Sequence, residues 1–139
     1  MLSKKVYITP SAFVAFVDRG HAKHPHASAY FRYFGIEKYW LFTDSQSITE
    51  AYRRIYTDIS PSLAKDFMRT IYLSDINILY PQDSDMKASL KAIVTYRSTD
   101  FTFSEALIDV LAYRRGIQQI CTFDYFHQLF GLENFYLPI

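Results

Sequence analysis

The chain has 139 residues, half of them hydrophobic and 18% aromatic, a length and composition that support one packed domain and exclude a disordered chain. Fifteen Lys and Arg residues against 14 Asp and Glu give a net charge of +1, so no global positive field favours binding to phosphate backbones. Any nucleic-acid site therefore has to be local.

Strand and helix patterns alternate in the first half of the chain. Thr9 and Pro10 interrupt a short β-prone run, and the stretch 43–47 offers several helix-capping residues. We expect, in chain order, a strand at 6–8, helices from Ala12 and at 27–34, a strand at 40–42, and a helix carrying Glu50.

The second half continues the same alternation. Ser60 and Pro61 suit the N-cap and first position of a helix, and Gly116 suits a C-cap. The expected elements are a helix from Ser60 through Ile71, a strand at 76–79, helices at 83–96 and 102–115, and a strand at 117–121. The helix at 83–96 has apolar residues on one face, namely Met86, Leu90, Ile93 and Val94. This order predicts one three-layer α/β domain over residues 1–139, a small, mainly parallel sheet flanked by helices.

Cysteine usage and hydropathy indicate where the protein works. The single cysteine, Cys121, has no partner for an internal disulfide, which argues against a secreted scaffold. The apolar stretch 12–17 is too short to span a bilayer, and no export segment is visible. We therefore expect a cytoplasmic protein with no membrane segment.

Polar and acidic side chains fall where a parallel sheet binds its ligands. Thr9, Thr43 and Asp124 stand at or just past predicted strand ends, and these ends converge at one edge of a sheet. Glu50 lies about a turn into one helix and Glu105 opens another, so both can lean toward the same crevice. Clustered carboxylates repel one another unless a cation is held between them, and oxygen ligands favour Mg²⁺ or Mn²⁺.

Three stretches of the sequence carry a resemblance to a known family. Residues 6–16 form a strand-turn-helix opening, 43–54 supply an acidic residue, and 102–126 read TFSEALIDVLAYRRGIQQICTFDYF. Together they resemble the PIN domain ribonucleases, which include the toxin subunits of many bacterial toxin–antitoxin pairs. The resemblance runs nearly end to end, and the order and spacing of the motifs are more specific than any one of them.

The resemblance implies a PIN-like fold and a four-carboxylate pocket that binds Mg²⁺ or Mn²⁺ and hydrolyses phosphodiester bonds in RNA. Glu50 stands where the family has its glutamate, and Asp124 stands where it has its last aspartate. Glu105 takes a position where aspartate is usual, and Thr9 replaces the first aspartate, normally a central ligand. The family also implies two partners, a small antitoxin and a second copy of the chain.

The threonine at position 9 leaves two functions open. In the first, the protein is a metal-dependent endoribonuclease weakened by Thr9, with Glu50, Glu105 and Asp124 as metal ligands. Asp109, one helical turn after Glu105, is a further candidate ligand. In the alternative, the protein is a catalytically inactive PIN-like domain that binds RNA or a protein partner, because a threonine hydroxyl is only a weak, neutral ligand.

Structural interpretations compete with these functional ones. Thr9 before a proline is a good helix start, and Thr102 with Glu105 has the spacing of a capping box, as does Ser47 with Glu50. Each glutamate can therefore accept a hydrogen bond from a backbone N–H at the start of its helix instead of binding a ligand.

Arginine pairs are the candidate RNA contacts, because guanidinium groups pair bidentately with phosphate. Arginines near the C-terminus of a helix are also favourable partners of the helix dipole, which offers the second pair a structural interpretation. The two pairs are Arg53 with Arg54 and Arg114 with Arg115.

Overall fold

The computed structural model describes residues 3–97, 100–124 and 131–138. Within these ranges, five parallel strands form one sheet in the order β3-β2-β1-β4-β5. The strands are β1 (Lys5–Ile8), β2 (Trp40–Asp44), β3 (Asn77–Leu79), β4 (Gln119–Cys121) and β5 (Glu133–Asn134). The first strand therefore lies in the middle of the sheet, with β2 on one side and β4 on the other.

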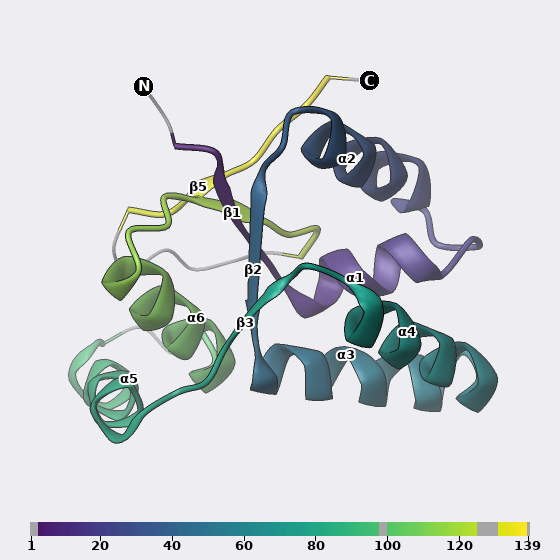
Figure 1. Cartoon of the computed structure of the whole chain (residues 1–139). Helices are drawn as coiled ribbons and strands as arrows, with labels where there is room; N and C mark the ends of the chain where they lie inside the picture. Colours follow the sequence, from purple (N-terminus) through teal and green to yellow (C-terminus); the bar gives the residue numbers. More distant parts are fainter. Residues whose placement is uncertain (1–2, 98–99, 125–130, 139) are drawn as a thin grey trace.

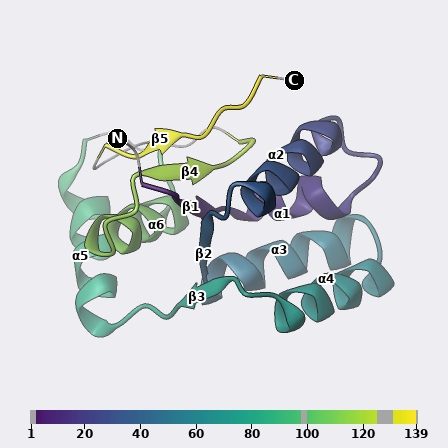
Figure 2. The same ribbon diagram turned by 45° about the horizontal axis from the view of Figure 1, so that its top comes forward.

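Helices cover both faces of the sheet. In the described ranges they are α1 (Pro10–Val17), α2 (His24–Ile36), α3 (Ser45–Asp58), α4 (Pro61–Leu73), α5 (Asp83–Thr95) and α6 (Phe103–Arg114). Figures 1 and 2 show α1 to α4 gathered on one side of the sheet and α5 with α6 on the other. The predicted three-layer α/β architecture is confirmed. Among these helices, none is both long and apolar enough to cross a bilayer.

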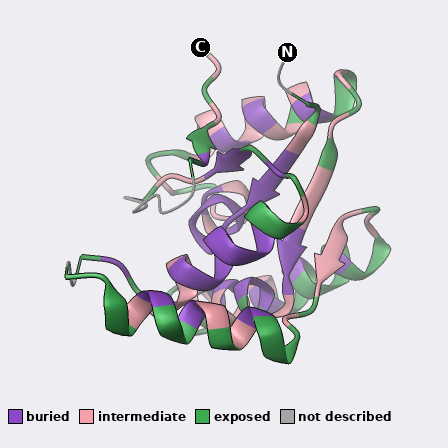
Figure 3. Cartoon of the chain, turned by 90° about the vertical axis from the view of Figure 1, so that its left-hand side faces the viewer, coloured by how far each residue is buried: buried purple, intermediate pink, exposed green. Residues whose placement is uncertain are grey.

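The alternation of side chains along β1 explains why the protein has two cores. Val6 and Ile8 point to one face of the sheet and pack with α1 to α4. Tyr7 points to the opposite face and packs with Leu107 and Leu111 of α6. Val6, Tyr7 and Ile8 are all fully buried, and Figure 3 shows the buried residues along the central strands and the helix surfaces that face them. A strand buried on both faces is typical of a parallel sheet.

Two helix boundaries follow the predicted capping chemistry. Ser60 is the N-cap of α4, and its hydroxyl accepts a hydrogen bond from the backbone N–H of Leu63 at 3.0 Å. Gly116 follows the C-cap of α6 with φ of +67°, a left-handed conformation that glycine adopts without a Cβ clash. The next residue, Ile117, donates its N–H to the carbonyl of Ala112 at 2.9 Å, which closes the helix end.

The predicted apolar face of α5 is buried only in part, since Met86 and Ile93 pack against the two core clusters on this side of the sheet. Leu90 and Val94 of that face are exposed, and the buried residues are Asp85, Ser89 and Ala92. Asp85 is buried because it caps its own helix at the backbone N–H of Gln82 and forms an ion pair with a residue of α6. Helical spacing thus identified the element correctly, whereas polar contacts decided which side of it faces α6.

Candidate acidic site

The candidate site lies where the strand order of the sheet reverses. From β1 the chain adds β2 and β3 on one side, and it later returns to place β4 against the other side of β1. Ligands of open α/β sheets bind at the carboxyl ends of the strands at such a switch point. Thr9 follows β1 directly, and Thr122 to Asp124 follow β4.

At this point a polar pocket brings together the carboxylates that the sequence singled out. Glu50 of α3, Glu105 of α6 and Asp124 after β4 all line one cavity of about 120 Å³, which we call the acidic pocket. One arginine, Arg54, shares this lining with the three carboxylates. The remaining described lining residues are Thr9, Pro10, Ser11, Thr102, Ser104, Ile108 and Thr122.

A buried aspartate sets the start of α3 and so the position of Glu50. Asp44 is the N-cap of α3 and is fully buried, and its carboxylate accepts hydrogen bonds from the Ser47 N–H at 2.8 Å and the Ser47 hydroxyl at 2.7 Å. The Tyr7 hydroxyl donates a third at 2.6 Å. Burial, followed by the charge of Asp44, raises the pKa of Tyr7 well above its ordinary value, so this phenol keeps its proton to higher pH than an exposed tyrosine does. The alternative of a Ser47–Glu50 capping box is wrong, because Asp44 is the cap.

Thr9 connects β1 to β4 through its hydroxyl. The residue takes the predicted N-cap position of α1, but its hydroxyl makes no capping hydrogen bond to the helix, and it is only 3% exposed. Its Oγ1 donates to the Cys121 carbonyl at 3.1 Å and lies 3.1 Å from the Ser11 Oγ. Ser11 in turn lies 3.1 Å from the Thr122 Oγ1, which donates to the backbone carbonyl of Asp124 at 3.3 Å. A chain of hydroxyls thus supports the loop that presents Asp124.

Arg54 places a positive charge between two of the carboxylates. Its Nη2 lies 3.0 Å from Glu50 Oε1, and its Nη1 lies 3.4 Å from Asp124 Oδ2. The Arg54 side chain is 33% exposed, that of Glu50 27% and that of Asp124 63%. Since each pair is partly open to water, it contributes little to stability, and its main effect is on the charge of the pocket.

Glu105 has both of the interpretations that the sequence left open. Its Oε1 accepts hydrogen bonds from the Thr102 N–H and hydroxyl, each at 3.2 Å, while the Glu105 N–H donates to the Thr102 hydroxyl at 3.2 Å. This capping box starts α6, and the same residue lines the acidic pocket. The cap fixes the glutamate at the pocket wall.

The oxygen donors suit a hard divalent ion in chemistry, although their present contacts are with other protein groups. Carboxylates from α3, α6 and the β4 loop face one polar cavity, which is the ligand type that Mg²⁺ and Mn²⁺ prefer. Within the described ranges, however, no three His, Cys, Asp or Glu side chains are grouped closely enough to hold a metal ion. Binding would require Arg54 to move away from Glu50 and Asp124.

The other predicted RNA and metal contacts lie at different distances from the pocket. Arg53 lines a shallow polar depression next to it, which shares Glu50 and Ser104 with the pocket. Arg114 lies at the other end of α6 from Glu105, where its Nη1 binds Asp85 at 2.9 Å and the hydroxyl of Ser84 at 3.0 Å. The structure therefore brings Arg53 and Arg54 to the site, and it does not bring Arg114.

Asp109 and Arg115 also lie away from the acidic pocket. Asp109 is fully buried and lines a separate cavity of about 270 Å³ beside Gly116 and Leu132. Arg115 is the C-cap of α6, at the end opposite Glu105. Neither is among the described residues that line the acidic pocket.

Sequence reasoning missed two features of the site. The hydroxyls of Ser11 and Thr122 have no motif that distinguishes them from surface residues. Arg54 was identified as an RNA contact, but its pairing with Glu50 was not, although the i,i+4 spacing of opposite charges on a helix is a usable signal.

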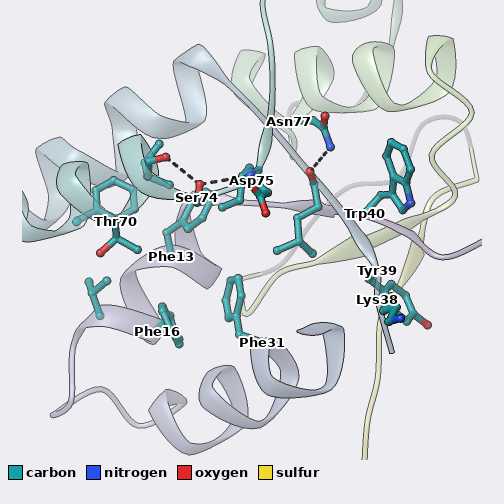
Figure 4. A pocket seen from close by; sticks show the side chains of 15 residues that line it. Phe13, Phe16, Phe31, Lys38, Tyr39, Trp40, Thr70, Ser74, Asp75 and Asn77 are labelled. Atoms are coloured by element: carbon teal, nitrogen blue, oxygen red, sulfur yellow. Dashed lines mark hydrogen bonds between the residues drawn. The ribbon is translucent and has the colours of Figure 1, made fainter. Parts of the chain in front are cut away.

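A larger, apolar cavity lies between α1, α2, α4 and the start of β2. Its volume is about 490 Å³, and Figure 4 shows Phe13, Phe16 and Phe31 along one part of its wall and Trp40 with Tyr39 at the other end. Trp40 is 63% exposed, an unusual state for a tryptophan in a chain with a large core.

Comparison with solved structures identifies the fold. The structure is similar to the crystal structure of VapC20 from Mycobacterium tuberculosis, described as a toxin that cleaves the sarcin–ricin loop, with a TM-score of 0.75. The chain has a PIN-like fold. The similarity covers 86% of this chain and 89% of VapC20 at 17% sequence identity. No family model and no curated protein matches the sequence. The PIN-like architecture expected from the sequence is thus confirmed.

Proposed function

We propose that the protein is a PIN-type, divalent-metal-dependent endoribonuclease, the toxin of a toxin–antitoxin pair, weakened by Thr9. The observation that carries this proposal is the meeting of Glu50, Glu105 and Asp124 in one polar cavity at the switch point of the sheet. These residues come from positions far apart in the sequence. The similarity of the fold to a toxin described as cleaving RNA supports the same activity class.

The roles of the residues follow from their chemistry. A bound Mg²⁺ or Mn²⁺ ion would polarise a phosphoryl oxygen and lower the pKa of a water molecule. Glu50 and Asp124 would hold that ion, and Glu105 would contribute an oxygen from a position fixed by its capping box. Arg53, in the depression beside the pocket, would contact a phosphate of the RNA backbone. Thr9 would position Asp124 through the hydroxyl chain and supply no charge.

Calorimetric titration with MnCl₂ tests the metal site without a guess about the RNA. We expect saturable binding by the wild type and its loss in Asp124→Asn. Asp66→Asn is the matched control, since Asp66 is an exposed carboxylate on α4 that also pairs with an arginine. Equal binding by the wild type and Asp124→Asn would contradict the proposed site.

A cleavage assay tests the activity itself. The first substrate is an RNA hairpin with the sarcin–ricin sequence, chosen because VapC20 is described as cutting that loop. We expect slow, Mn²⁺-dependent cleavage that Asp124→Asn abolishes and that a DNA hairpin of the same sequence does not show. Cleavage that persists in EDTA and in Asp124→Asn would show that the activity comes from elsewhere.

A non-cutting domain is the second candidate function. Thr9 and the pairing of Arg54 with two carboxylates favour it, because both reduce the negative charge that would hold a cation. Absence of Mn²⁺ binding in the wild type, together with binding regained in Thr9→Asp, would favour this candidate over the enzyme.

The proposal extends to partners and location. An exposed apolar surface of the kind around Trp40 is typical of protein contacts, and we propose that a small antitoxin covers it. We also propose a homodimer that acts in the cytoplasm. Co-expression with the product of a neighbouring reading frame, followed by light scattering, tests both contacts. A monomeric protein that does not co-purify with that product would contradict them.

A further inference from the structure

The lining of the acidic pocket includes a positively charged side chain, that of Arg54. Of the three carboxylates in the pocket, Glu50 and Asp124 both face the guanidinium of Arg54, at 3.0 and 3.4 Å. The two contacts use different nitrogens of the guanidinium, so one side chain bridges α3 and the loop after β4. A planar group with several donors is suited to such a bridge.

The bridge uses oxygens that a metal ion would need. Glu50 Oε1 and Asp124 Oδ2 are the atoms paired with Arg54, and both residues line the cavity in which the ion would sit. A divalent ion and a guanidinium cannot share the same small cavity without strong repulsion between like charges. One has to leave before the other binds.

Position on the helix makes Arg54 able to leave. Its side chain is one-third exposed, and it lies one turn beyond Glu50 on α3, near open solvent. A long, flexible side chain in this position can turn outward without any change in the backbone. Glu105 has no such freedom, because its capping box fixes it.

We infer that Arg54 is a built-in competitor of the divalent ion, which neutralises Glu50 and Asp124 in the metal-free protein and sets the affinity of the pocket for metal. This inference rests on the proposed metal site. According to this inference, Thr9 and Arg54 both reduce the negative charge of the pocket, and only the Arg54 side chain can move out of it.

Manganese titration of Arg54→Gln tests the inference by binding and needs no activity. Removal of a unit charge a few ångströms from a divalent ion predicts Mn²⁺ affinity about tenfold higher than in the wild type. Arg69→Gln is the control, because Arg69 forms an i,i+3 ion pair with Asp66 on α4 and its removal makes the same change in net charge. This control should bind Mn²⁺ like the wild type, and circular dichroism verifies that each variant is folded.

Two further variants test whether the effect depends on the charge of Arg54 and on its contact with Asp124. Arg54→Lys keeps the charge and should stay within about threefold of the wild type, because a point charge still opposes the ion. Asp124→Asn combined with Arg54→Gln should show no saturable Mn²⁺ binding, because removal of Arg54 does not replace the lost ligand. Binding by this double variant equal to that of Arg54→Gln alone would overturn the competition with Asp124.

The outcomes separate this inference from the proposed function. Wild-type binding that Arg54→Gln leaves unchanged or weakens overturns the inference and leaves the metal site standing. Absence of Mn²⁺ binding in every variant, including Arg54→Gln, overturns the metal site and the inference with it. Binding that appears only when Arg54 is replaced supports the inference in its strongest form.

Discussion

The buried hydrogen bond between Tyr7 and Asp44 offers a direct test of how the site is supported. Tyr7→Phe removes the 2.6 Å hydrogen bond from the phenol to the carboxylate and keeps the ring, so no large cavity forms. Asp44 retains its two bonds from Ser47, at 2.7 and 2.8 Å, and stays buried. A hydrogen bond to a charged group contributes about 1.5–3 kcal/mol, so we expect the free energy of unfolding to fall by about 2 kcal/mol.

Urea denaturation followed by circular dichroism measures this change as a lower midpoint at an unchanged slope. Tyr72→Phe is the matched control, because Tyr72 is 86% exposed and its hydroxyl removal should alter stability by less than about 0.5 kcal/mol. If the free energy of unfolding of Tyr7→Phe lies within about 0.5 kcal/mol of the wild-type value, the bond does not anchor the start of α3.

Two other predictions concern Cys121 and Thr9. Burial raises the pKa of the Cys121 thiol from 9.0 to about 12, so the folded state holds more protons than the unfolded state above pH 9, and stability should fall as pH rises. In the wild type, this effect lowers the free energy of unfolding by up to about 1.4 kcal/mol per pH unit between pH 9 and 12. Cys121→Ala should not show this part of the decline in urea denaturation, and parallel pH profiles of the two proteins would refute the prediction. Thr9→Asp loses the donor to the Cys121 carbonyl and should unfold about 1–2 kcal/mol more easily without metal. Added MnCl₂ at a hundredfold excess over Kd should restore about 2.7 kcal/mol in a thermal melt, and an absence of any metal effect on this variant would contradict the restored site.

The central strands were predictable because a buried strand appears in the sequence as a short run of apolar residues. Val6 to Ile8 and Ile120 to Cys121 form the two strands on either side of the switch point, and both read as buried strands in the sequence. The terminal strand β5 was not predicted. It consists of Glu133 and Asn134, both exposed, and pairs in parallel with β4, so no hydrophobic pattern marks it.

The acidic residues of the site were predictable from their places after strands and at helix starts, whereas their contacts were not. Glu50, Glu105 and Asp124 meet as expected. The direction of Arg54 depends on Asp124, which lies 70 residues away, and a pairing over that distance leaves no local signal. Arg114 belongs to the same class, because its partner Asp85 lies 29 residues away on another helix and no local motif pairs the two.

The central place of β1 determines when the pocket can come into being during synthesis. A growing chain that has reached residue 100 already contains Thr9 and Glu50, and it can pair β1 with β2 and β2 with β3. The other edge of β1 is still unpaired because β4 has not been synthesised. The acceptor of the Thr9 hydroxyl, a carbonyl 112 residues further on, is also not yet present. Contacts of such long sequence separation form late in folding. A ribosome would therefore have to pass residue 124 before the acidic pocket exists, which delays any activity of this site until β4 and the residues that follow it are synthesised.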